Sequence, residues 1–137
     1  METYAPIVKD ALWQMIEAGG RTAQTFGLSR LLGQIYMLLY LIDKTLSLDQ
    51  MVDELSVSKA SVSIACRQLQ ELGAIHRITR KGDRRDFYEA EQDFKGLLHH
   101  GLMPALEKKL ESARIQIEQC RLMLGNSNSN DAAEKKS

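Results

Sequence analysis

The sequence predicts a mainly α-helical domain with one small antiparallel β-hairpin. Apolar residues recur every three or four positions through most of the chain up to residue 124, as they do on the buried side of helices. Two short helical segments within residues 47–73 lead directly into two alternating stretches that flank a charged glycine turn, which is typical of a hairpin. A regular seam after residue 105 indicates a last helix that pairs with another helix.

Composition fits one compact domain. The chain has 137 residues, of which 44% are hydrophobic and 26% are charged, as in ordinary globular domains. The longest apolar run, residues 35–42, ends at Asp43 and is far shorter than the roughly 20 residues of a membrane span. The first ten residues lack the pattern of a secretory signal, so we expect a cytoplasmic protein that does not associate with membranes.

Two helices are expected before residue 47. The first has helical spacing over residues 4–18 and should end at Gly19 and Gly20. Ser29 is placed to cap the second helix, which is apolar over so much of its circumference that it should form the centre of the core. Its apolar residues are Leu31, Leu32, Ile35, Leu38, Leu39 and Ile42.

A helix–turn–helix follows. Ser47 and Gln50 form a capping box that opens a short helix to about Leu55, and Ser58 caps a second helix that ends near Gly73. Steps of three and four place one set of residues inward, namely Val62, Ala65, Leu69 and Leu72. The opposite, outward side carries Ala60, Ser63, Ile64 and Arg67.

The rest of the chain reads as a hairpin and a long helical region. AIHRIT and DFYEA are the expected strands, and RKGDRR is the turn between them. Helix should begin near Glu91, break around Gly101 and Pro104, and resume to about Leu124. In that second part, spacings of 4, 3, 4, 3 and 4 define a seam typical of paired helices, made of Leu106, Leu110, Ala113, Ile117, Cys120 and Leu124. Residues 125–137 are too polar to bury a face and predict a disordered tail.

Charge is distributed unevenly although the net charge is zero. Residues 58–86 hold seven Lys or Arg and three Asp or Glu, whereas residues 1–57 hold four and seven. A local basic patch of this kind attracts polyanions without making the whole protein cationic.

The helix pair and the basic turn together predict binding to double-stranded DNA. Helix 58–73 has the small and basic outward residues of a helix that enters the major groove, and the turn over residues 80–86 can reach the minor groove or the phosphates. The residues expected to contact DNA are Ser58, Lys59 and Ser61 at phosphates, Ala60, Ser63, Ile64 and Arg67 at bases, and Arg80, Lys81, Arg84 and Arg85 from the turn. Gly82 and Asp83 should shape that turn, with Asp83 holding Arg85 by a charge-assisted hydrogen bond. The competing interpretation is a solvated helix face and a surface hairpin with weak ion pairs.

A family resemblance supports the DNA-binding interpretation. SLDQMVDELSVSKASVSIACRQLQELGAIHRITRKGDRRDFYEA resembles the winged helix-turn-helix of MarR-type transcriptional repressors. LSRLLGQIYMLLYLIDKTLSLDQ, SVSKASVS and KGDRRDFYEAE resemble the GbsR branch of that family more closely. The resemblance implies a homodimeric regulator, with Ser58 to Arg67 as the recognition helix and Asp83, Arg84 and Arg85 as the wing motif.

The resemblance also sets the expected domain layout. We expect one winged-helix domain over residues 1–124, with an N-terminal dimerisation helix and connection in residues 1–26. The winged helix-turn-helix core would span residues 27–90 and the C-terminal dimerisation helices residues 91–124, so that the homodimer forms through the terminal helices.

Members of this branch are associated with osmoprotectant uptake, and some sense choline. The resemblance thus implies a small cationic effector, which aromatic faces can hold by cation–π attraction. Trp13, Tyr36 and Tyr40 are the candidates, with Tyr36 and Tyr40 on one helical face. Aromatic residues four apart on a buried helix are more often part of the core.

Nothing in the sequence favours a metal, a cofactor or catalysis. His99 and His100 are adjacent, so on a helix they point about 100° apart and cannot easily share one ion. Cys66 and Cys120 belong to no paired motif and should be small apolar fillers, with a redox switch as the other interpretation.

The predicted function is therefore a sequence-specific, double-stranded DNA-binding transcriptional regulator, with a repressor favoured over an activator. The alternative is a winged-helix module that binds another protein and has no specific DNA binding.

Overall fold

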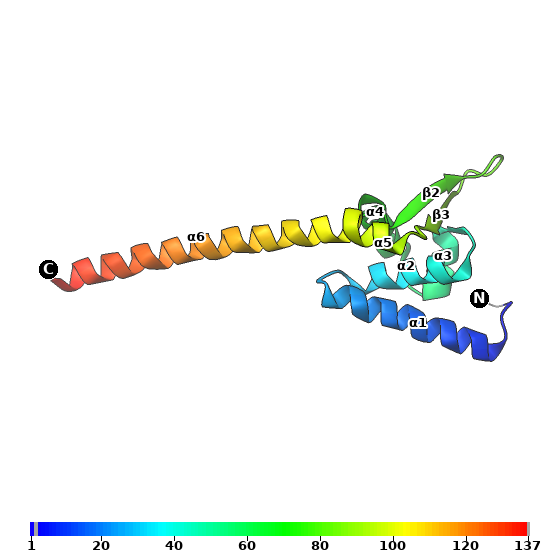
Figure 1. Cartoon of the computed structure of the whole chain (residues 1–137), viewed down its shortest axis with the longest axis horizontal. Helices are drawn as coiled ribbons and strands as arrows, with labels where there is room; N and C mark the ends of the chain where they lie inside the picture. The colour runs from blue at the N-terminus through cyan, green and yellow to red at the C-terminus, as the bar shows by residue number, and fades with distance from the viewer. Residues whose placement is uncertain (2, 137) are drawn as a thin grey trace. The chain divides into compact units, whose positions relative to one another are not determined.

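The computed structural model describes Met1 and residues 3–136, with side chains up to Asn128. It divides into two compact units, Met1–Leu102 and the segment from Met103 onward. Figure 1 shows the elements of the first unit. They are α1 (Pro6–Thr25), α2 (Arg30–Ile42), β1 (Leu46–Ser47), α3 (Leu48–Leu55), α4 (Lys59–Glu71), β2 (Ile75–Thr79), β3 (Asp86–Ala90), α5 (Phe94–Gly96) and the π-helical segment η1 (Leu97–Leu102). No described helix combines the length and the apolar character needed to cross a membrane.

Helix α2 forms the centre of the first unit, as its apolar circumference predicted. Ile35, Leu38 and Leu39 are at most 1% exposed, and they pack with buried residues from α1, α3, α4 and the sheet. The predicted cap is only half confirmed. Ser29 occupies the N-cap position of α2, but its side chain accepts no capping hydrogen bond.

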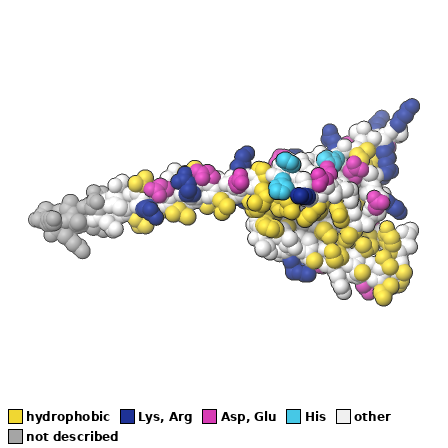
Figure 2. Space-filling view, in the orientation of Figure 1, with side chains coloured by type: hydrophobic (Ala, Val, Ile, Leu, Met, Phe, Trp, Pro, Cys, Tyr) yellow, Lys and Arg dark blue, Asp and Glu magenta, His cyan; other side chains and the backbone are white. Residues whose placement is uncertain are grey.

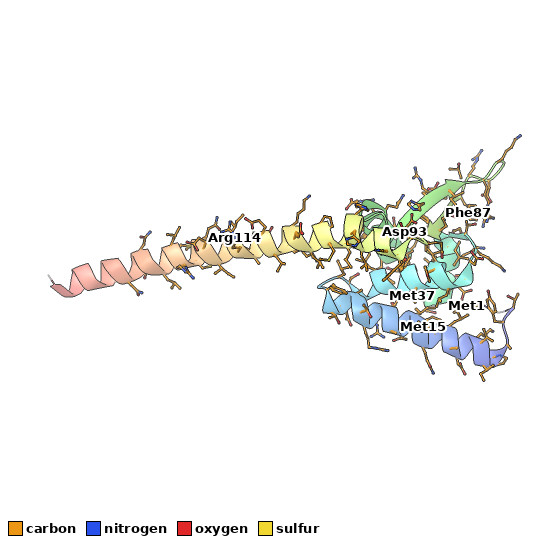
Figure 3. All side chains as sticks on the ribbon, viewed as in Figure 1. Met1, Met15, Met37, Phe87, Asp93 and Arg114 are labelled. Carbon is orange, nitrogen blue, oxygen red and sulfur yellow. The ribbon has the colours of Figure 1, made fainter. Side chains whose placement is uncertain are left out.

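Helix α1 does not end at Gly19 and Gly20, so that prediction is wrong. The helix continues to Thr25, and the two glycines serve the packing of α1 against α2. A Cβ on Gly19 would lie 2.8 Å from the carbonyl oxygen of Gly33, and a Cβ on Gly33 would overlap the backbone of Gly19. Glycine costs a helix about 1 kcal/mol relative to alanine, but here it permits a backbone approach that no other residue allows. Met37 of α2 lies between the two helices beside this contact (Figure 3).

The helix–turn–helix is confirmed. In the capping box of α3, the Gln50 amide donates to Ser47 Oγ (3.2 Å) and the Ser47 amide donates to Gln50 Oε1 (2.8 Å). The end of α3 is fixed by Ser56, whose φ is 54°, and α4 begins three residues later.

The sheet has one strand more than the sequence predicted. Its antiparallel order is β1-β3-β2, in which Leu46 of β1 pairs with Tyr88 of β3 and Ile75 of β2 pairs with Ala90. A strand of two residues is too short to show a period of two in sequence. Its effect is to hold the start of α3 against the hairpin.

The predicted break around Gly101 and Pro104 is a change of helix type. Residues 97–102 form a π-helix that passes directly into α6 (Met103–Lys136). A Cβ on Gly101 would overlap the carbonyl oxygen of Leu72, so glycine permits close packing there. Pro104 has no N–H to donate, and near the start of a helix this donor is not needed.

Helix α6 also continues past Leu124, where the sequence predicted a disordered tail over residues 125–137. The structure has helical backbone through Lys136. Gly, Asn and Ser are weak helix formers, which motivated the prediction, but no proline interrupts residues 125–136 and Ala132 to Lys136 favour helix. Ser137 lies outside the described residues.

Candidate nucleic-acid interface

Helix α4 presents the outward side that the sequence predicted. Its N-terminus is capped by Ser58, whose Oγ accepts a hydrogen bond from the Ser61 amide (3.1 Å). Val62, Ala65 and Leu69 are buried, while the predicted base-facing residues Ala60, Ile64 and Arg67 are exposed and Ser63 is half-buried. Ile64 is 56% exposed, which leaves an apolar side chain free for contact with a partner such as a thymine methyl group.

Lys59, the first residue of α4, is held by the preceding helix. Its Nζ lies 3.1 Å from Oδ1 of Asp49 in the first turn of α3. Asp49 was not singled out from sequence, because ten residues separate the two and no local pattern joins them.

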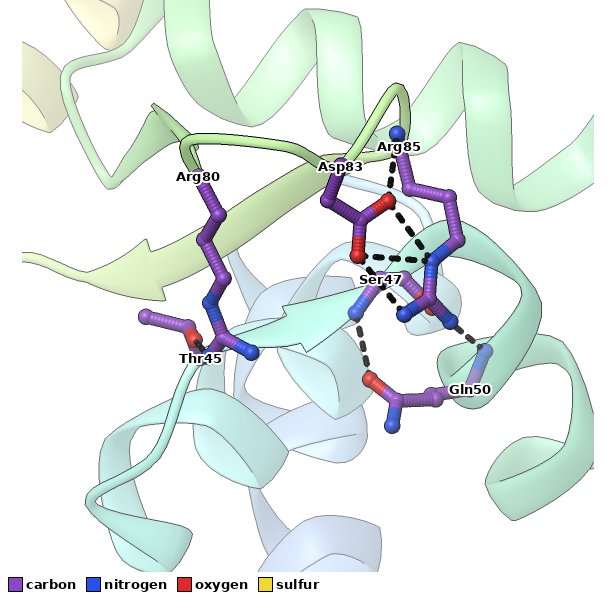
Figure 4. Close-up of polar contacts among 6 residues, drawn as sticks. All are labelled: Thr45, Ser47, Gln50, Arg80, Asp83 and Arg85. Carbon is purple, nitrogen blue, oxygen red and sulfur yellow. Dashed lines mark hydrogen bonds and ion pairs between the residues drawn. The ribbon is translucent and has the colours of Figure 1, made fainter.

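The wing tip, residues 80–86, is shaped by Asp83 as predicted. The Arg85 amide donates to Asp83 Oδ1 (3.0 Å), and Arg85 Nη2 donates to Asp83 Oδ2 (2.9 Å), as Figure 4 shows. Hydrogen bonds from the Arg85 side chain and backbone lower the pKa of Asp83 to about 2. Since the folded-state pKa lies below the ordinary value, the pair is intact at neutral pH and is lost only as pH falls toward 2. Gly82 has a φ of 81°, which glycine adopts without strain.

Arg80, the first residue of the wing tip, is held by two residues outside the tip, Thr45 and Phe87. Its guanidinium lies 3.9 Å from the centroid of the Phe87 ring and donates to the Thr45 hydroxyl, which lies just before β1. Phe87, which is labelled in Figure 3, is buried, and Figure 4 shows the Arg80 side chain reaching Thr45. The sequence did not identify Thr45, because the contact depends on the unpredicted strand β1.

Lys81 and Arg84 are the cations that the wing tip leaves available. Both are exposed, and within the described part of the chain neither makes a hydrogen bond or an ion pair. Figure 2 shows Lys and Arg side chains gathered over the hairpin. We call the outward side of α4 and the wing tip together the reading surface. The fold thus brings two groups of predicted DNA contacts, about 20 residues apart in sequence, onto adjoining elements.

Of the three residues predicted to bind an effector, the structure brings two together. The Tyr36 and Tyr40 rings lie 5.7 Å apart, but no ring contact joins Trp13 to either of them among the described residues. The Tyr36 hydroxyl donates to the Glu91 carbonyl oxygen (2.9 Å), and burial raises the pKa of Tyr36 to about 12. Tyr36 therefore has a structural role in the core, whether or not it also contacts an effector.

Tyr36 also borders an apolar cavity within the first unit. The cavity has a volume of about 300 Å³, and its walls come from α1, α2, α4, α5 and η1. Neither Tyr40 nor Trp13 lines it, and its lining contains no Asp, Glu, Lys or Arg.

The histidines and cysteines form no shared site in the described part of the chain. His99 and His100 are both exposed on η1, and no group of three metal-ligating side chains is found among the described residues. Cys66 is 1% exposed, and burial raises the pKa of its thiol to about 12, so it stays protonated and poorly reactive at neutral pH.

The predicted seam lies on α6 of the second unit, and most of it is open in the single chain. Leu110, Ile117 and Leu124 are 70%, 62% and 66% exposed. Apolar residues this exposed at heptad spacing are typical of a helix that packs against another helix.

Comparisons with known proteins agree with this geometry. Residues 26–86 match the family model described as "MarR family". The chain is 28% identical over 107 residues to the HTH-type transcriptional repressor GbsR of Bacillus subtilis strain 168, a match that covers 78% of this chain and 59% of that protein. It is 26% identical over 93 residues to the repressor OpcR of the same strain, with 68% and 50% covered. The chain therefore spans little more than half the length of these relatives.

A solved structure shares the fold. It is described as a transcriptional regulator, and it superposes with a TM-score of 0.65 at 21% identity over 80% of this chain and 75% of that one. The chain thus has a winged-helix fold, matches the MarR-family model over residues 26–86, and is similar to the transcriptional repressors GbsR and OpcR.

Proposed function

We propose that the protein is a homodimeric transcriptional regulator that binds specific sequences of double-stranded DNA in the cytoplasm. A repressor is favoured over an activator. The observation that carries the proposal is the reading surface. It combines an outward side of α4 on which Ile64 and Arg67 are exposed with the tip of the hairpin that follows α4, where Lys81 and Arg84 are available. Helix α4 would read base edges in the major groove. The wing tip would follow the minor groove or its phosphates.

Within the wing tip, the cations have different roles. Lys81 and Arg84 would contact DNA directly, while Arg85 is held by Asp83 and Arg80 by Thr45 and Phe87. Arg85 and Arg80 still contribute positive potential, but each would have to leave a partner to reach a phosphate. The names of the relatives, both repressors, support regulation of transcription as the outcome of binding.

The wing can be tested by replacing Lys81 and Arg84 with alanine together. If each residue neutralises one phosphate, the slope of log K against log salt concentration should become shallower by about 1.8 per subunit, or about 3.6 for a homodimer on two half-sites. Titrations of the wild-type and variant chains against duplex DNA at several salt concentrations measure this slope.

In the control, alanine replaces two cationic residues outside the reading surface, Arg21 of α1 and Lys95 of α5. It should keep the wild-type slope. If the wing variant kept that slope too, the wing would have no part in DNA binding. Absence of any duplex binding by the wild-type chain at low salt would favour the alternative, a module that docks another protein through the same surface.

A small cationic effector such as choline is a second proposal, supported by the adjoining Tyr36 and Tyr40 rings and by the similarity to GbsR. Each ring would contribute about 0.5–2 kcal/mol.

The neighbouring cavity offers no carboxylate, and an unpaired charge is costly to bury. We therefore expect weak binding, with millimolar choline reducing DNA affinity by less than about tenfold. A Tyr40→Leu variant should lose this response; an equal response in both proteins would place any choline site elsewhere.

A further inference from the structure

In addition to Asp83 and Asp86 of the wing tip, an acidic side chain of α3 lies beside the reading surface. Asp49, in the first turn of α3, lies 3.1 Å from Lys59 Nζ, and the two side chains are 62% and 66% exposed. Lys59 begins α4, where a lysine is well placed for a phosphate beside the major groove. The free protein thus pairs a phosphate-binding cation with its own carboxylate.

Asp49 also acts on the wing. The pKa of Arg85 is raised mainly by Asp83 and additionally by the charge of Asp49. One carboxylate of α3 therefore faces the N-terminus of α4 and, through space, the wing tip. A phosphate approaching either element meets its negative charge.

We propose that Asp49 competes with DNA phosphates for Lys59 and so limits the affinity of the reading surface for DNA. The inference rests on the proposed function, because it needs DNA as the ligand. Exposed ion pairs contribute little net stability, so DNA can break this one easily. The carboxylate nevertheless remains beside the phosphates, within the roughly 8–10 Å over which charges still interact in physiological salt.

Asp49 has two other conceivable roles, and the structure argues against both. An acidic residue in the first turn stabilises a helix, but α3 already has the complete capping box of Ser47 and Gln50. The second role would be to orient Lys59 for DNA. However, an exposed pair gives little orientation, whereas removal of a negative charge next to DNA reduces electrostatic repulsion of the phosphates.

The inference is tested with Asp49→Asn, which keeps the size of the side chain and removes its charge. Affinity should rise about two- to fivefold per subunit, and it should rise equally for a selected duplex and an unrelated one, because phosphates are common to both. The salt dependence of log K should steepen by up to about 0.9 per subunit, since Asp49 then no longer offsets the charge that Lys59 brings to a phosphate.

Three further variants make the result specific. Asp53→Asn removes an exposed acid one turn later on α3, which makes no ion pair within the described residues, and it should change affinity less than Asp49→Asn. Lys59→Gln should cost more affinity in the Asp49→Asn background than in the wild-type chain, because only there is the lysine unopposed. Asp49→Ser should repeat the effect of Asp49→Asn, and circular dichroism confirms that each variant is folded.

The outcomes separate the inference from the proposed function. If the wild-type chain binds neither duplex, both are overturned. If it binds with a salt-dependent affinity but Asp49→Asn binds equally well or more weakly, or gains no more than Asp53→Asn, the inference alone is overturned.

Discussion

Replacing Gly33 by alanine should lower the free energy of unfolding by about 2 kcal/mol. Alanine would gain about 1 kcal/mol in helix propensity, but its methyl group would overlap the backbone of Gly19. Helices α1 and α2 would have to separate, and overpacking of this kind costs about 3 kcal/mol at its upper range. Thermal unfolding followed by circular dichroism, at one fixed protein concentration, should show a melting temperature lower by about 6–10 °C.

Gly125→Ala provides the matched control, because the same substitution is made in a helix where a Cβ would meet nothing within 4 Å. Only the gain in propensity remains there, so stability should be unchanged or higher by up to about 1 kcal/mol. If Gly33→Ala proved as stable as Gly125→Ala, the close contact between α1 and α2 would not contribute to stability as argued.

This contact also marks where sequence reasoning about the fold failed. Gly19 and Gly20 predicted a helix end, because glycine is a poor helix former and a common terminator. The two glycines lie inside α1 because α1 packs closely against Gly33 of α2, which is fourteen residues after Gly19 in the chain. A sequence pattern within one segment cannot show a contact with another segment. The capping box at Ser47, by contrast, was predictable because its donor and acceptor lie three residues apart.

In the candidate site, too, contacts between residues close in sequence could be predicted, and contacts between distant residues could not. The outward side of α4 follows from the spacing of its apolar residues, and the Asp83–Arg85 pair follows from two neighbouring charges of opposite sign. The partners of Arg80 and Lys59 could not be predicted. Thr45 lies 35 residues from Arg80, and Asp49 reaches Lys59 only because the turn after α3 brings the two helices together. Sequence thus identified the cations, while the structure identifies which of them are already paired.

Replacing both Leu110 and Ile117 by glutamate should dissociate the proposed homodimer and reduce DNA affinity by about a hundredfold or more. The two residues are 70% and 62% exposed in the single chain and lie seven positions apart, so they share one side of α6. Glutamates at this seam would face each other across the interface as unpaired charges. Two linked winged-helix domains bind two half-sites with an avidity of about 10²–10⁴ over one domain, and a monomer forfeits this gain.

Sedimentation measures the loss of the dimer, and titration of a duplex with two half-sites measures the loss of affinity. The control is Ser112→Glu with Gln119→Glu, which adds the same charge at the same spacing on the opposite side of α6, where both residues are exposed. This variant should remain dimeric and bind DNA within a fewfold of the wild type, the small difference reflecting long-range repulsion. Dissociation by the control alone, or a dimer that survives the Leu110 and Ile117 changes, would show that the interface lies on another surface. Binding of a single half-site should be nearly equal in all three proteins, because the reading surface belongs to the first unit and contains neither pair of substituted residues.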